Sequence, residues 1–242
     1  MERDEKDKSI VRLSLTVLVD DNICREGLLG AHGLSLFLSL VDRQGEKYHI
    51  LFDVGPDSEL LKINSEILGL NLRRINHVVI SSLINHHSSA FFEKNSYLRE
   101  ILPIKVIIRS IQAFHQNNNI LNIGDISLKV LNLRGLWNER ALLIPHVKGW
   151  IALLGCSVHG LEWSLKLLGN IVKENIYALI GGFGLSELDT FSFKILKEFV
   201  NKRNVKLLVP LHSTANNAKE ELRKEFKNIT PKRTGVGQNI TI

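Results

Sequence analysis

The sequence has few of the features that mark secreted, disulfide-rich or membrane-embedded proteins. Only two cysteines occur, Cys24 and Cys156, and without a Cys-x-x-Cys pair they indicate neither a disulfide framework nor a thiolate zinc site. No run approaches the roughly 18 consecutive apolar residues of a membrane-spanning helix. The first residues are charged where a signal peptide would be apolar. We therefore expect a cytoplasmic protein with no membrane segment, in which both cysteines are buried small hydrophobic side chains.

The chain also lacks a concentrated block of basic charge, although its net charge is +6 and its pI is about 9.3. The densest basic stretch, residues 219–233, also contains Glu220, Glu221 and Glu225. Such spacing is typical of a solvated helix face rather than of a nucleic-acid track. We expect no nucleic-acid partner, and an RNA-associated role is kept as a second alternative, to which the basic pI contributes because it favours attraction to phosphates.

With 242 residues, of which 44% are hydrophobic, the chain can close a substantial core. Residues 1–9 are predicted to form a flexible charged tail and residues 10–242 a single domain, because no linker, repeat or low-complexity tract divides them. Apolar runs and alternation over 11–19, 34–41 and 48–52 predict an antiparallel opening, with a hairpin turn at Asp42–Gly45.

Strands and helices mix along the rest of the chain. Asp57 is a helix N-cap and Gly69 a stop, which predicts a helix over 57–68. Further helices are predicted over 110–116, 161–172, 190–200 and 215–226, and strands over 78–81, 105–109, 126–131, 141–147, 150–154, 178–180, 205–211 and 239–242. Several strands are apolar on both faces, which indicates sheets covered by helices.

Polar or glycine-rich residues follow four of these strands. The segments are 52–55, 81–89, 155–160 and 210–214. In open α/β sheets, ligands collect at the carboxyl ends of strands, so we expect these loops to surround one cleft. The segment from Val78 to Ser89, in which a buried strand stops at a polar loop bearing His86 and His87, is typical of how a metal site is mounted.

With these loops in order, the chain resembles the metallo-β-lactamase fold superfamily, within it the branch similar to dihydropterin ribofuranosylaminobenzene phosphate synthase. The matching segments are residues 18–22, 32–36, 50–55, 79–81, 155–157, 180–183, 209–212 and 235–237. The resemblance implies an α/β fold, a four-layer αββα sandwich of two mixed β-sheets with outer helices and a metal cleft along one edge. It also implies metal-dependent hydrolysis, or a related transfer, on a phosphorylated or otherwise anionic small molecule.

The sequence departs from the family pattern at the first metal ion. The family holds that ion through the two early histidines of the 81–89 loop and the histidine after Gly-Cys-Ser. Those positions are Ser82, Ile84 and Val158 here. Isoleucine and valine have no lone pair to donate, and a serine hydroxyl is a poor zinc ligand, so we expect this site to be absent.

The positions of the second ion keep side chains that can bind metal. In the family they are the aspartate and last histidine of the loop and the histidine after Pro-Leu, which are His86, His87 and His212 here. Three imidazoles with an open fourth position describe a mononuclear catalytic zinc site. In the alternative arrangement His86 faces solvent, and His87 and His212 form a hydrogen bond across an empty cleft.

The resemblance also suggests a ligand-binding cleft. An acid at the position of Asp53 orients metal histidines in active relatives, and its alternative role here is to cap turn amides before Gly55. His32, Asn22 and Asp21 resemble substrate-facing positions, and Gly184 stands where many relatives carry a histidine. The predicted cleft residues are Asn22, His32, Asp53, Ser82, Ser157 and Gly184, and none is assigned a catalytic role.

We therefore predict a pseudo-enzyme that keeps the fold and an anion-binding cleft but has lost the dimetal hydrolase centre and has no resident cofactor. Its role would be binding, regulatory or structural, with an anionic small molecule, another protein or an active paralogue as partner. The alternative is a hydrolase or transferase that uses one zinc, iron or manganese ion at His86, His87 and His212.

Overall fold

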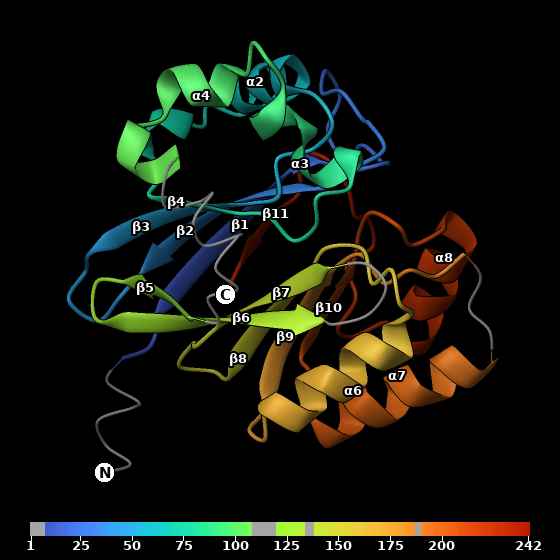
Figure 1. Cartoon of the computed structure of the whole chain (residues 1–242). Helices are drawn as coiled ribbons and strands as arrows, with labels where there is room; N and C mark the ends of the chain where they lie inside the picture. The colour runs from blue at the N-terminus through green and yellow to red at the C-terminus, as the bar shows by residue number, and fades with distance from the viewer. Residues whose placement is uncertain (1–7, 108–119, 134–137, 187–189) are drawn as a thin grey trace.

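A computed structural model describes residues 8–107, 120–133, 138–186 and 190–242, and it contains two β-sheets with helices on their outer faces (Figure 1). The first sheet has the order β11-β1-β2-β3-β4, and the second has the order β10-β9-β8-β7-β6-β5. Each combines parallel with antiparallel pairs. The predicted αββα sandwich of two mixed sheets is thereby confirmed.

The elements have the following bounds. The first sheet consists of β1 (Arg12–Val19), β2 (Ser35–Val41), β3 (Lys47–Phe52), β4 (His77–Val79) and β11 (Asn239–Thr241). The second consists of β5 (Ile120–Ile123), β6 (Ile126–Leu133), β7 (Glu139–Ile144), β8 (Trp150–Leu154), β9 (Ile176–Gly181) and β10 (Leu207–Pro210). The helices are α2 (Ser58–Ile67), η1 (Leu72–Arg74), α3 (Asn85–Phe92), α4 (Tyr97–Ile101), α6 (Leu161–Ile171), α7 (Thr190–Lys202) and α8 (Asn216–Glu225).

Three apolar layers explain why the strands are apolar on both faces. The first layer lies between the sheets, where Leu15 of β1 and Leu153 of β8 belong to one buried cluster. A second layer packs α2, α3 and α4 against the first sheet, and a third packs α6, α7 and α8 against the other (Figure 1). Burying both faces of each sheet in this way removes most of the apolar surface from water.

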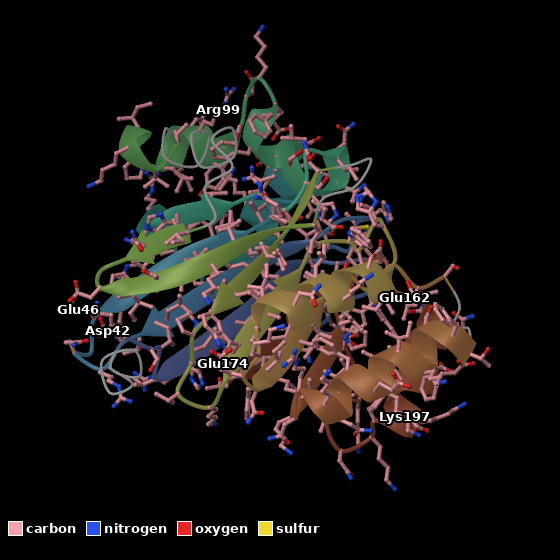
Figure 2. The ribbon with its side chains drawn as sticks, turned by 60° about the horizontal axis from the view of Figure 1, so that its bottom comes forward. Asp42, Glu46, Arg99, Glu162, Glu174 and Lys197 are labelled. Carbon is pink, nitrogen blue, oxygen red and sulfur yellow. The ribbon has the colours of Figure 1, made fainter. Side chains whose placement is uncertain are left out.

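Local signals placed several elements correctly. The Asp42 carboxylate accepts the amides of Gln44 and Glu46 at the β2–β3 turn, and Asp42 and Glu46 lie together at that end of the molecule (Figure 2). Asp57 is the N-cap of α2 and accepts the Leu60 amide. These side-chain acceptors satisfy amides that the turn and the first helical turn leave unpaired.

One strand prediction is wrong. Residues 104–107 are helical rather than extended, and they follow Pro103, whose carbonyl accepts the Val106 amide. Val106 and Ile107 pack into the apolar layer under α4, so burial of a short β-branched run rather than sheet pairing explains its composition. Residues 108 and 109, and the predicted helix over 110–116, lie outside the described residues.

The described part of the predicted N-terminal tail is short. Residues 1–7 lie outside the described residues, Lys8 is exposed and Ser9 is buried. Within the described ranges, no helix has both the length and the apolar character needed to cross a membrane.

Candidate metal centre

Side chains from three strand ends meet at one edge of the sandwich. His86 and His87 lie in the first turn of α3, Cys156 follows β8, and His212 follows β10. One nitrogen of each histidine and the cysteine Sγ all lie within 4.8 Å of one another. The structure thus brings together all three predicted metal ligands and adds a thiol.

The three histidines also have unsatisfied ring nitrogens. The Nε2 atoms of His86, His87 and His212 are buried and have no hydrogen-bond partner among the residues that the structure describes. A buried polar atom without a partner costs free energy, and three of them in one cluster need an explanation. The donor set of three imidazoles and one thiol fits a tetrahedral transition-metal ion, for which Zn²⁺ is the standard occupant.

A buried carboxylate holds His87 in place. The Asp53 Oδ2 atom lies 2.7 Å from His87 Nδ1, and both side chains are fully buried. The same carboxylate accepts the amide and the hydroxyl of Ser81, each at 2.6 Å. With Nδ1 bonded to a carboxylate, Nε2 is left as the ligand atom, which is the arrangement typical of metal-binding histidines.

Asp21 plays the same part for His212. Its Oδ2 atom lies 2.9 Å from His212 Nδ1, and its Oδ1 atom lies 2.8 Å from His32 Nδ1. The His212 side chain is fully buried, whereas the His32 side chain is 70% exposed. The carboxylate therefore connects a buried candidate ligand to an exposed imidazole, whose ring centroid lies 4.7 Å from that of His86.

Opposing effects set the ionisation of these groups. Burial by itself would lower the pKa of His87, but the adjacent Asp53 carboxylate outweighs it and raises that pKa to about 10. Burial would raise the pKa of Cys156, but contacts with His212, His86 and His87 lower it to about 4. Burial would also raise the pKa of Asp21, which its bonds to His212 and His32 lower to about 2. In the metal-free cluster the Cys156 thiolate and the protonated His87 ring therefore stabilise each other, and binding of a metal ion to both would release the His87 proton.

Cys156 is a candidate ligand that the sequence analysis did not identify. Both cysteines are half-buried, so the prediction that they are buried hydrophobic side chains is wrong. A search for Cys-x-x-Cys pairs cannot find a thiol whose co-ligands lie 56 to 70 residues away in the chain. The available signal was its place in the loop directly after β8, one of the four strand ends expected to line the cleft.

The positions of the family's first metal ion hold no ligand-type group. Ile84 and Val158 are aliphatic, and the buried Ser82 hydroxyl lies 3.3 Å from the Ile84 amide. Nearby, the buried Glu139 carboxylate accepts the amides of Cys156 and Ser157, each at 2.7 Å, as well as that of Val158 at 3.0 Å. Glu139, which the sequence analysis did not single out, therefore fixes the loop that carries Cys156.

The other predicted cleft residues lie at different distances from the histidine cluster. The buried Ser157 hydroxyl donates to the Gly182 carbonyl at 2.8 Å. A Cβ atom on Gly184 would lie 2.6 Å from the Ser157 carbonyl oxygen, so this glycine permits close packing against the Cys156 loop. Asn22 lines a separate pocket, to which none of the four cluster residues contributes. Of the six predicted cleft residues, Asp53 and His32 have the most direct contact with the histidines.

Comparisons with known proteins agree with this architecture, although no family model matches the chain. It is 24% identical over 251 residues to the 7,8-dihydropterin-6-methyl-4-(β-D-ribofuranosyl)-aminobenzene-5'-phosphate synthase of Methanocaldococcus jannaschii, covering 81% of this chain and 85% of that protein. A solved metal-dependent hydrolase of the β-lactamase superfamily matches with a TM-score of 0.68 at 20% identity, over 94% of this chain and 98% of the other.

A second solved structure, the metallo-β-lactamase fold protein YhfI from Bacillus subtilis, has a TM-score of 0.61 at 14% identity. The match covers 96% of this chain and all of the other. At such identities the solved structures establish the fold alone. The chain has the metallo-β-lactamase fold, and its similarity to a curated protein matches the phosphate synthase-like branch that its motifs indicate.

Proposed function

We propose that this chain binds one transition-metal ion through His86, His87, His212 and Cys156, and that it lacks the two-ion hydrolytic centre common in this fold. The observation that carries the proposal is the convergence of three buried, unpaired imidazole nitrogens with a cysteine sulfur. A nitrogen and sulfur donor set favours zinc over the harder manganese ion. The ion would supply a Lewis acid at the cleft.

The groups around the first-ion positions support the proposed absence of a second ion. Ile84 and Val158 have no donor atoms, and the Glu139 carboxylate is engaged by three backbone amides. A two-ion site generates and positions hydroxide between its ions, so one ion does not reproduce that mechanism.

Four protein ligands also bear on the role of the single ion. Tetrahedral sites closed by four protein ligands are generally structural, whereas catalytic sites keep one position open for water. A site completed by Cys156 therefore supports the binding or regulatory role of a pseudo-enzyme. The ligand class that best fits the cleft is an anionic small molecule, and the name of the curated relative, a 5'-phosphate synthase, agrees with that class.

A one-ion hydrolase or transferase is the second candidate. Cys156 and His86 are half-buried rather than fully enclosed, and the exposed His32 stands beside them on Asp21. If Cys156 does not occupy the fourth position, three histidines and a water molecule describe a catalytic site for an anionic ester or phosphate. An RNA-associated role has only the pI in its support and is the weakest of the three.

Cobalt substitution tests the proposed ligand set. We expect one Co²⁺ per chain, with a tetrahedral visible spectrum and a thiolate charge-transfer band in the near ultraviolet. Cys156→Ser should keep the ion and lose the charge-transfer band, and His212→Ala should lose the ion. Cys24→Ser is the matched control and should change nothing. Failure to bind cobalt, binding of two ions, or a band that persists in Cys156→Ser would contradict the proposal.

Activity assays then separate the closed site from the one-ion enzyme. Zinc-loaded wild-type protein and Cys156→Ala would be offered phosphate mono- and diesters. A closed site predicts no turnover by the wild-type protein. Turnover by the wild-type protein that His212→Ala abolishes would instead establish the one-ion enzyme.

A further inference from the structure

A second feature of the structure is a basic pocket of about 320 Å³, whose lining includes Asn22, the residue after Asp21. Three cationic side chains line it, from Arg223, Lys232 and Arg233, against one acidic side chain, Glu220. The pocket is therefore positively charged, unlike the neighbouring site, where Asp21 and Asp53 supply carboxylates. The mixed charges of this stretch had predicted a solvated helix face, but the fold gathers the cations around one cavity.

The cations are held in place to different degrees. The Arg223 guanidinium donates to the Pro231 carbonyl at 3.2 Å and lies 3.5 Å from Thr234 Oγ1. Such anchoring reduces the rotamer entropy that ligand binding would otherwise cost. Arg233 and Lys232 are exposed, so their charged groups remain accessible to a ligand from solvent.

A buried ion pair, Lys219 with Asp20, also acts on this part of the molecule. Lys219 is 1% exposed, and its Nζ atom, which has no hydrogen-bond partner among the described residues, lies 3.7 Å from Asp20 Oδ1. Burial, and next the charge of Asp20, raise the pKa of the Cys24 thiol, which lines the pocket, while the charges of Arg233, Lys219 and Arg223 oppose that rise. The three cations therefore reach this wall of the pocket together with the charge of the buried Asp20.

Backbone groups complete the lining. Asn216, the first residue of the ten-residue helix α8, faces the pocket, and the N-cap residue Ala215 has no side chain that accepts a helix amide. The N-terminal end of a helix attracts negative charge. Two guanidinium groups, one ammonium group and this helix end make a combination suited to a phosphate group.

The pocket and the metal cluster are built on the same two loops. Asn22 of the pocket directly follows Asp21, whose carboxylate holds His212, and α8 begins four residues after His212. We propose that this pocket binds the phosphate group of a phosphorylated small molecule whose other end lies at the histidine cluster. The placement of the ligand's other end at the histidine cluster rests on the proposed function. Binding of the phosphate group does not, because it does not require the metal.

A small molecule fits this pocket better than a nucleic acid. A volume of about 320 Å³ is at the lower end for small-ligand sites and holds one phosphate with a sugar-sized group. On α8 the exposed Glu220 and Glu221 interrupt the basic surface, whereas a nucleic-acid track needs continuous positive charge.

Cys24 provides a reporter within the pocket. Metal-free protein would be alkylated with iodoacetamide in increasing inorganic phosphate or glycerol phosphate at constant ionic strength, and the modification of each cysteine would be followed by peptide mass spectrometry. We expect either phosphate probe to slow Cys24 alkylation several-fold, while chloride does not. Arg233→Gln should need at least ten times more phosphate than the wild-type protein for the same protection. Lys227, an exposed lysine outside the pocket lining, is the control, and Lys227→Gln should behave like the wild-type protein.

The same assay distinguishes this inference from the metal proposal. His212→Ala should retain phosphate protection even though it loses metal binding. Equal protection by chloride, no protection by either phosphate probe, or full protection in Arg233→Gln would overturn the inference. If a single-stranded oligonucleotide protects Cys24 and neither phosphate probe does, the inference is overturned in favour of a nucleic-acid partner.

Discussion

Replacing Asp53 with asparagine should weaken metal binding without moving the backbone. Asp53 has a φ of 55°, in the left-handed region that asparagine tolerates well. Its two oxygens accept three hydrogen bonds, from the Ser81 amide, the Ser81 hydroxyl and His87 Nδ1. An asparagine amide keeps only one acceptor oxygen, so either the Ser81 amide or the His87 ring loses its partner.

The magnitude follows from the role of such carboxylates. Loss of a partner that orients a metal-binding histidine typically costs 10- to 100-fold in metal affinity, or about 1.4–2.7 kcal/mol. Desolvation of the unpaired buried group would also lower the free energy of unfolding by about 1–3 kcal/mol. Both effects are within reach of standard measurements on a folded variant.

Competition with a chromogenic zinc chelator would measure the affinity, and circular dichroism would confirm that Asp53→Asn is folded. Ser81→Ala is the matched control, because it removes the hydroxyl bond to Asp53 and leaves the 2.7 Å bond to His87 in place. A folded Asp53→Asn protein with unchanged zinc affinity would refute the reasoning, since His87 would then not be a ligand that Asp53 orients.

Three other predictions concern stability. Glu139→Gln should lower the free energy of unfolding in urea by about 1–3 kcal/mol, because the amide group cannot accept all three backbone amides; an unchanged midpoint would contradict that role. Lys219→Met should lower the free energy of unfolding by about 3 kcal/mol in the same assay, because it leaves Asp20 buried without its cation. A stabilised variant would show that Asp20 is neutral. Burial, and next the charge of Lys148, lower the pKa of His146 below 6.5, so protonation of this ring favours the unfolded chain. The stability that neutral His146 contributes is therefore present above pH 6.5 and lost as the pH falls. Urea titrations between pH 7 and 5 should show this loss, and His146→Asn should make it smaller.

The fold could be predicted from local signals because several of them agreed. Alternation and the Asp42 turn indicated the hairpin of β2 and β3, and apolar runs on both faces indicated covered sheets. The error at residues 104–107 arose where periodicity does not distinguish a short buried helix from a strand. There, packing under α4 rather than local preference determined the structure.

The candidate site was predicted in part. The four strand ends do come together, and the three histidines lie in one cluster. The observed arrangement differs from the predicted polar loop, because α3 begins at Asn85 and carries His86 and His87 in its first turn.

Cys156 could not be identified from ligand spacing, because its position is not a metal ligand in the family pattern that the chain resembles. The basic pocket was missed for a similar reason. Its cations alternate with glutamates in the sequence, and only the fold separates Arg223 and Arg233 from most of them. Both features depend on the direction in which side chains leave a helix or loop, and tertiary packing determines that direction.

The number and position of metal ions in the purified protein test the central claim most directly. Elemental analysis combined with anomalous diffraction at the zinc edge should find one ion per chain, bound by the Nε2 atoms of His86, His87 and His212 and by the Cys156 sulfur. Two ions bridged by solvent near Ile84 and Val158, or no ion in protein prepared with excess zinc, would contradict it.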